Sequence, residues 1–133
     1  MTRPVYVLDA SVGVKWFRDE PGCDDARDLL RRYGRHEILI AVDALFFYEV
    51  LRASTRDRTT QDALRIWGDL ARLNLIAVPL GNELVTAAVK AREHLGCTLY
   101  DAFSAGLADL LDARLYSADA RAHGSHPRVE LIA

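Results

Sequence analysis

Residues 5–11 read VYVLDAS, an apolar run with two valines followed by an acid, a small residue and a hydroxyl. A short apolar run with β-branched residues is typical of a buried strand, so we expect a strand over residues 5–8. Asp9 and Ser11 are residue types that begin helices, and they favour a helix that extends to Phe17. An acid placed between a strand and the next helix lies where α/β sheets form their sites.

The same alternation of strand and helix continues along the chain. Further apolar runs predict strands, and their positions are residues 38–42, 75–78, 115–117 and 129–132. Apolar residues at helical spacing predict helices over residues 24–33, 44–56, 60–73, 83–94 and 98–112. Strands that alternate with helices indicate an α/β fold in which a mainly parallel sheet is flanked by helices.

Length and composition restrict the number of domains and the location. The 133 residues suit a single domain over residues 1–133. No apolar run approaches the roughly 20 residues that cross a bilayer, and the first residues, MTRPVYVLD, do not resemble a secretory signal. We therefore expect no membrane association and a cytoplasmic location. Cys23 and Cys97 belong to no CxxC motif, so we expect two unpaired thiols.

Four acids occupy positions that an α/β fold brings together. Asp9 and Asp119 each follow a predicted strand, so both should lie at the same edge of the sheet. Asp101 is in the first turn of its predicted helix. Glu49 lies in residues 44–56, the most apolar helix of the chain, where a charge requires a partner or a metal ion.

Each acid also has a structural interpretation when it is taken alone. The two acids that follow strands could cap helices. Asp101 ends the stretch Thr98-Leu-Tyr-Asp, which resembles a capping box. Glu49 could pair with Arg52 or Arg56, which lie near its side of the predicted helix.

Taken together, the four acids favour a metal site. Oxygen ligands without a matching set of histidines or cysteines suit Mg²⁺ or Mn²⁺. Clustered carboxylates without a cation would repel one another and take up protons. A divalent ion held there could bind a phosphodiester and lower the pKa of a water molecule. The sequence therefore predicts a metal site that acts on a phosphate substrate.

Four segments resemble the successive acidic motifs of PIN domains, in the family's order and approximate spacing: VYVLDAS, FFYEVLRA, TLYDAFSAGLA and LYSADAR. The first three are similar to those of bacterial VapC toxins. The resemblance implies a three-layer α/β/α fold and an Mg²⁺- or Mn²⁺-dependent endoribonuclease that uses a metal-activated water. It also implies a homodimer and an antitoxin protein that blocks the site. Residue by residue, it assigns the metal-binding catalytic acids and two supporting hydroxyls to Asp9, Glu49, Asp101, Asp119, Ser11 and Ser117.

Three further features concern ligands and partners. We expect Arg52 and Arg56 to help hold RNA phosphates, because arginine binds phosphate in a planar fork. The helix over residues 44–56 has almost no polar side, so part of it should lie at an interface with a second copy or an antitoxin. His123 and His126 lie in a loop-like stretch without other ligands, and we interpret them as structural.

Three other functions stay open on the sequence alone. A degenerate PIN domain would bind RNA or protein without cleavage. A phosphatase would use Asp9 as its nucleophile, but such enzymes keep a second aspartate two residues later, where this chain has Ser11. A receiver-like signalling domain would need a lysine near its last strands, whereas the two lysines are Lys15 and Lys90.

Overall fold

In the computed structural model, which describes residues 2–133, strands alternate with helices along the chain. The strands are β1 (Val5–Leu8), β2 (Leu39–Asp43), β3 (Ile76–Val78), β4 (Arg114–Ser117) and β5 (Val129–Leu131). The helices are α1 (Ala10–Gly13), the 3-10 turn η1 (Val14–Trp16), α2 (Cys23–Gly34), α3 (Ala44–Ser54), α4 (Thr60–Arg72), α5 (Asn82–Leu95), α6 (Leu99–Leu111) and α7 (Ala120–His123).

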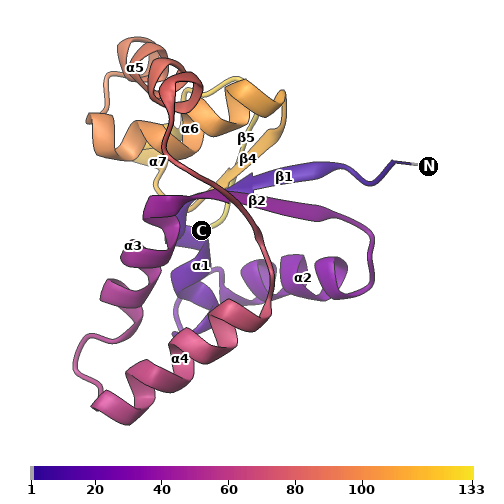
Figure 1. Ribbon diagram of the computed structural model, residues 1–133, viewed down its shortest axis with the longest axis vertical. Helices are drawn as coiled ribbons and strands as arrows, with labels where there is room; N and C mark the ends of the chain where they lie inside the picture. Colours follow the sequence, from indigo (N-terminus) through magenta and orange to yellow (C-terminus); the bar gives the residue numbers. More distant parts are fainter. Residues whose placement is uncertain (1) are drawn as a thin grey trace.

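The strands form one parallel sheet in the order β3-β2-β1-β4-β5. Helices α5 and α6 cover one face of the sheet, and α1 and α2 lie on the other, together with α3 and α4 (Figure 1). This arrangement confirms the expected three-layer α/β/α fold. It also brings the carboxyl ends of all the strands to one edge of the sheet, because every strand runs in the same direction.

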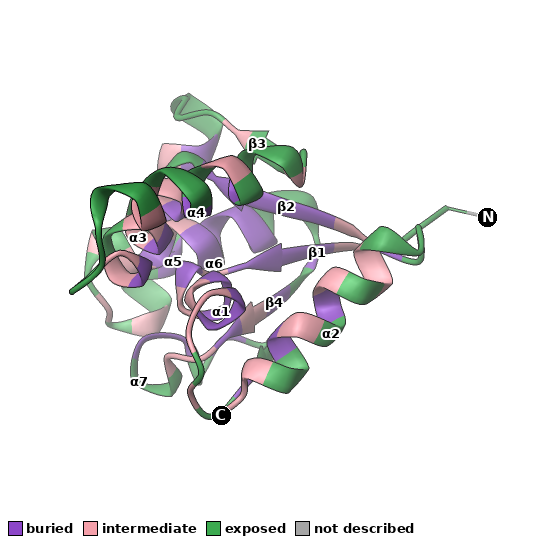
Figure 2. Cartoon of the chain, turned by 90° about the horizontal axis from the view of Figure 1, so that it is seen from below, coloured by how far each residue is buried: buried purple, intermediate pink, exposed green. Residues whose placement is uncertain are grey.

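Successive side chains of β1 enter two different cores. Tyr6 and Leu8 pack with Ile40 on the side of α1 and α2. Val7, between them, packs with Leu115 on the side of α5 and α6. The central strands are buried on both faces (Figure 2), which explains why residues 5–8 are apolar without the alternation of a half-exposed strand.

The expected elements differ from the observed ones mainly at their ends. The helix predicted to extend to Phe17 is α1 followed by the tighter turn η1. Strand β3 begins one residue later than predicted and lies at the edge of the sheet, where Ile76 is 43% exposed.

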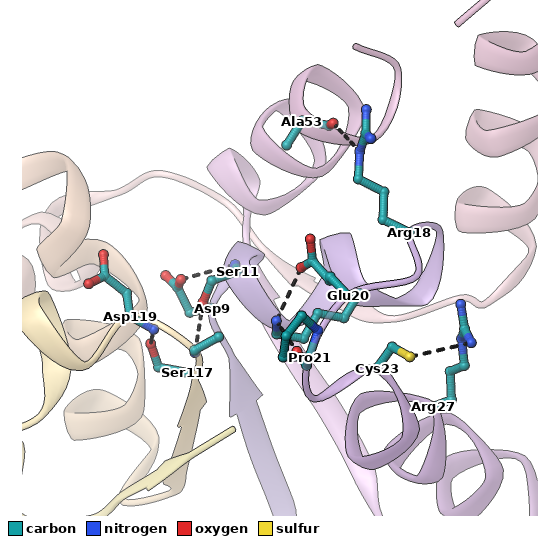
Figure 3. A network of polar contacts seen from close by, with 12 residues as sticks. Asp9, Ser11, Arg18, Glu20, Pro21, Cys23, Arg27, Ala53, Ser117 and Asp119 are labelled. Carbon is teal, nitrogen blue, oxygen red and sulfur yellow. Dashed lines mark hydrogen bonds and ion pairs between the residues drawn. The ribbon is translucent and has the colours of Figure 1, made fainter. Parts of the chain in front are cut away.

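Helix α3 ends at Ser54, two residues before the predicted end, and a distant arginine binds a carbonyl group on each side of that end. Arg18 donates from Nε to the Ala53 oxygen at 2.8 Å (Figure 3). It also donates from Nη2 to the Arg56 oxygen at 2.7 Å. The chain turns after Ser54, and Arg56 does not lie on the helix of Glu49.

Two expectations from composition concern thiols and membranes. Cys23 and Cys97 are free and partly buried, as predicted. Within residues 2–133, no helix has the length and apolar character needed to cross a membrane.

Helices α5 and α6 pack unusually closely because the residues between them are small. A Cβ atom added at Gly106 would lie 2.6 Å from the backbone nitrogen of Ala88 and 2.7 Å from its Cα. Ala102, Ala105 and Ala108 continue the small, buried side of α6. Since backbone atoms cannot move aside as a flexible side chain can, the helix spacing depends on the absence of a side chain at Gly106.

We predict that Gly106→Ala lowers the free energy of unfolding by about 1–3 kcal/mol, because the added methyl forces α5 and α6 apart. Urea denaturation measures the change. The control is Gly34→Ala at the end of α2, where nothing lies within 4 Å of the added Cβ. That variant should be neutral or gain up to about 1 kcal/mol. Equal stability of the two variants would contradict the packing argument.

Candidate active site

Three neighbouring strands each deliver an acid to the same edge of the sheet. Asp9 follows β1, Asp43 ends β2 and Asp119 follows β4 by two residues. Each of these acids caps the helix that comes next. Asp43 caps α3, because its Oδ1 accepts the N–H groups of Leu45 and Phe46 at 2.8 and 3.2 Å.

The Asp9 carboxylate is held by one donor on each oxygen. Its Oδ2 accepts the backbone N–H of Ser11 at 3.1 Å. Its Oδ1 accepts the hydroxyl of Ser104, in α6, at 2.8 Å. These two bonds fix the orientation of the carboxylate and leave lone pairs on both oxygens for a ligand.

Ser11 joins the loop after β1 to the loop after β4. Its Oγ accepts the backbone N–H of Ala118 at 2.9 Å, and the N–H of Asp9 donates to the carbonyl of Tyr116 at 2.9 Å. Figure 3 shows the carboxylates of Asp9 and Asp119 on the same side of the sheet edge, with these loops between them. The hydroxyl that the family resemblance assigned to Ser11 therefore sets the spacing of two acids.

Ser117 is buried at the end of β4 and holds the backbone of Asp119. Its Oγ accepts the N–H of Asp119 at 3.0 Å and lies 2.7 Å from Nδ1 of His123. The Asp119 Oδ1 accepts the N–H of Ala122 at 3.1 Å, so one carboxylate oxygen caps α7 and the other is left for a ligand.

The pKa of Glu49 shows that the charges of the neighbouring acids reach its carboxyl group. Burial is the largest cause that raises its pKa, to about 7, and the charges of Asp9, Asp43 and Asp101 raise it further. A hydrogen bond from Tyr100 lowers it in part. No ion pair found within residues 2–133 joins Glu49 to Arg52 or Arg56, so the interpretation of Glu49 as a simple helix-surface pair is wrong.

Asp101 lies in the first turn of α6 and also lines a hollow in the surface. Its N–H donates to Thr98 Oγ1 at 3.1 Å, as the capping-box interpretation predicts. Its carboxylate is one of the charges that raise the pKa of Glu49, and with Asp119 it raises the pKa of the Cys97 thiol, for which burial is the larger cause. Asp101, Asp119 and Cys97 line a hollow of about 430 Å³.

The donor set suits a hard divalent cation. The acids at this edge offer only oxygen ligands, which Mg²⁺ and Mn²⁺ prefer, and their mutual repulsion would be relieved by a cation. In the part of the chain that the structure describes, no three acidic, histidine or cysteine side chains lie close enough together to hold a metal ion by themselves. Mg²⁺ is usually bound by only one or two carboxylates, with water and phosphate oxygens completing its coordination. The residues therefore fit such an ion.

Four residues of this region were missed by sequence reasoning. Asp43 adds a charge to the cluster, Tyr100 affects the pKa of Glu49, Ser104 orients Asp9 and His123 is buried beside Ser117. Two of them had a signal in the sequence. Ser104 lies three residues after Asp101 on one side of a helix, and Asp43 stands between a predicted strand and the next helix, as Asp9 does.

Arg52 and Arg56, the two arginines expected to hold phosphates, lie in different surroundings. The charge of Arg52 lowers the pKa of Tyr100, although burial and Glu49 raise that pKa more strongly. Arg52 therefore lies near the acids, whereas Arg56 is in the turn beyond α3.

The raised pKa of Glu49 predicts how stability without metal depends on pH. The unfolded carboxyl group loses its proton near pH 4.5 and the folded one near 7. Between these values the folded state binds more protons, so the free energy of unfolding falls as pH rises, on the order of 2 kcal/mol. Denaturation in EDTA at pH 5 and pH 8 measures this fall, which should be smaller in Glu49→Gln.

The control for this experiment is Glu93→Gln, which changes an exposed acid of α5. Glu93→Gln should keep the pH dependence of the wild type. If Glu49→Gln loses as much stability between pH 5 and pH 8 as the wild type does, the pH dependence of stability does not come from Glu49.

Bacterial toxin–antitoxin proteins have similar structures. A chain of a toxin–antitoxin complex from Klebsiella pneumoniae superimposes with a TM-score of 0.73 and 15% identity, over 94% of this chain and 95% of that chain. VapBC2 from Rickettsia felis, bound to a DNA fragment from its promoter, gives 0.72 and 15% over 96% of both chains. FitAcB from Neisseria gonorrhoeae gives 0.69 and 13% over 96% of both chains.

These identities are low, so the structural likeness shows the fold alone. No curated protein matches the sequence. The PIN domain family matches residues 6–124, a range that contains the four predicted acids and both serines. The match confirms the resemblance seen in the acidic motifs, and the chain belongs to the PIN domain family.

Proposed function

We propose that this protein is an Mg²⁺- or Mn²⁺-dependent endoribonuclease and the toxin of a VapBC-type toxin–antitoxin pair. The observation that carries the proposal is the acidic cluster at the sheet edge, where burial and, to a lesser degree, neighbouring carboxylates raise the pKa of Glu49 to about 7. Such a cluster is costly to the fold without a cation. It is explained if a cation and the phosphate of a substrate occupy the site during function.

Each acid has a role in the proposed site. Asp9, Glu49, Asp101 and Asp119 would hold the ion, directly or through its bound water molecules. Asp119 lines the same hollow as Asp101. Ser11 and Ser117 keep the strand ends in place through the bonds described above. When bound, a divalent ion lowers the pKa of a water molecule and stabilises the charge that develops on a cleaved phosphodiester.

Charge outside the site supports an RNA substrate. The net charge is −2, and setting aside the four acids leaves −2 + 4 = +2. The remaining residues thus carry a small net positive charge. Arg52, near Tyr100, and the exposed Arg121, beside the hollow of Asp101 and Asp119, are the cations placed to contact phosphates. We propose that the cleavage takes place in the cytoplasm.

An antitoxin or a second copy is the proposed partner of an apolar surface next to the site. Helices α3 and α4 and the edge strand enclose a hollow of about 480 Å³. It is lined by aromatic side chains, of which Tyr48 is 72% exposed and Trp67 45%. Exposed apolar surface of this kind marks interaction sites. Co-expression with a cognate antitoxin should therefore protect cellular RNA from cleavage.

The main alternative function is that of a PIN domain that binds RNA without cleavage, since such a domain would share the fold and the family. The full set of acids argues against it, because a pure binding domain has no need of repelling carboxylates. A phosphatase is a weaker alternative, which a covalent phosphoryl group trapped on Asp9 would support.

We predict that the purified protein cleaves RNA in Mg²⁺ or Mn²⁺ and stops when EDTA is added. Asp9→Asn should reduce the rate at least about 100-fold, because it removes a charged ligand while keeping nearly the same shape. Gel analysis of total RNA measures both. The control Asp69→Asn changes an exposed acid of α4 that pairs only with Arg72 in the structure, and it should cleave as the wild type does. Wild-type activity in Asp9→Asn would rule out the proposed centre.

Melting curves with and without Mn²⁺ test the place of Asp101 in this site. Its charge raises the pKa of Glu49, so Asp101→Asn should leave the metal-free protein equally or more stable at pH 8. The same variant should show a smaller Mn²⁺-dependent rise in melting temperature, because a cation that binds only the folded state stabilises it by mass action.

The opposite result follows if Asp101 acts only in the first turn of its helix. Asp101→Asn would then lose about 0.3–1 kcal/mol of stability without metal, from the helix dipole. Its Mn²⁺ shift would equal that of the wild type, and Asp101 would be removed from the site.

A further inference from the structure

One buried histidine touches several parts of the acidic edge. His123 is the last residue of α7, and 1% of its surface is exposed. Its Nε2 lies 2.7 Å from the carbonyl oxygen of Asp101 and 3.5 Å from Ser104 Oγ. Its Nδ1 lies 2.7 Å from Ser117 Oγ. The ring is therefore in contact with α6 and with the end of β4 at once.

The direction of each hydrogen bond follows from the chemistry of the partners. A carbonyl oxygen can only accept, so Nε2 carries the hydrogen that is donated to Asp101. In the neutral ring Nδ1 then accepts, and the Ser117 hydroxyl donates to it. The Ser117 oxygen accepts the N–H of Asp119 at 3.0 Å, and the hydroxyl of Ser104 donates to Asp9 at 2.8 Å. All these donors and acceptors are satisfied by one arrangement.

We propose that His123 is a positioning residue of the acidic site, which holds three carboxylates in the relative placement that a divalent cation requires. The ring reaches Asp101 through that residue's own carbonyl group and Asp119 through Ser117. It also packs against Ser104, 3.5 Å from Nε2, whose hydroxyl donates to Asp9. This inference rests on the proposed function, because it assumes that a cation binds these acids. Groups one step beyond the ligands commonly orient them and affect metal affinity.

A second buried histidine provides a matched control. His126 is 5% exposed, and its Nε2 lies 2.8 Å from the Asp109 carboxylate. Its Nδ1 accepts the N–H of Arg128 at 3.1 Å. Both histidines are thus buried and hydrogen-bonded through both nitrogens, but the bonds of His126 go to the end of α6 and to the segment before β5. Replacing His126 removes a comparable ring without changing a contact to the acids of the site.

The test is the dissociation constant for Mn²⁺, measured by calorimetry on the folded wild type, His123→Phe and His126→Phe. His123→Phe keeps a ring of similar volume and loses its hydrogen bonds, so its dissociation constant should rise about 10-fold or more. His126→Phe should stay within about 2-fold, even if both variants melt at lower temperature. His123→Gln retains a donor that can reach the Asp101 carbonyl, and it should recover part of the affinity. A purely structural role predicts no such difference.

A second measurement needs neither metal nor a variant. Nitrogen-15 spectra of the histidine rings in EDTA at neutral pH should show that Nε2 of His123 carries the hydrogen and Nδ1 does not. A ring with its hydrogen on Nδ1 would overturn the inference, as would a His123→Phe protein that binds Mn²⁺ as tightly as a Mn²⁺-binding wild type. A wild type that binds no Mn²⁺ would overturn the proposed metal centre itself, and the role of His123 with it.

Discussion

Repulsion between carboxylates at one edge of the sheet is the constraint on which the rest of this structure depends. All five strands are parallel, so their carboxyl ends meet at the same edge, and neighbouring strands β1 and β2 place Asp9 and Asp43 there. Glu49 reaches the same region from α3, and its pKa of about 7 measures how strongly burial and the other charges oppose its ionisation. Each of these carboxylates must therefore be held in place by contacts of its own.

The restraint comes from donors placed around the acids, since no ion pair within residues 2–133 joins a cation to any acid of this cluster. Asp9, Asp43 and Asp119 all accept backbone N–H groups at the starts of helices, and Asp9 also accepts the Ser104 hydroxyl. A hydrogen bond to a charged group is worth about 1.5–3 kcal/mol, so a few such bonds are comparable with the repulsion they oppose. Since these donors carry no net charge, the edge keeps its negative potential, as a cation site requires.

The fold and the main acids could be predicted from the sequence because both depend on local signals. An apolar run followed by an acid and a hydroxyl indicates a strand, a turn and a helix start, and four such acids in order match the PIN domain family. The partners of the acids could not be predicted in this way. Ser104 is 95 residues from Asp9. The turn at Arg56 is likewise bound by Arg18, 38 residues away, and no local pattern reveals either contact.

The composition of α3 follows from the three surroundings that this short helix meets. Phe46 and Val50 enter the core beside α1, and the Cβ of Gly13 is missing where their side chains approach. Tyr48 and Leu51 line the exposed hollow beside α4. The side that carries Glu49 meets the acidic edge. Arg52, which lies near the same acids, is the other charge of this helix, and most of the remaining side chains are apolar. The same apolar neighbours that surround Glu49 also remove water from its carboxyl group, and burial is the largest cause of its raised pKa. The hydrophobic character of α3 therefore contributes directly to the electrostatics of the candidate site, because it decides how much a proton or a cation at Glu49 stabilises the folded chain.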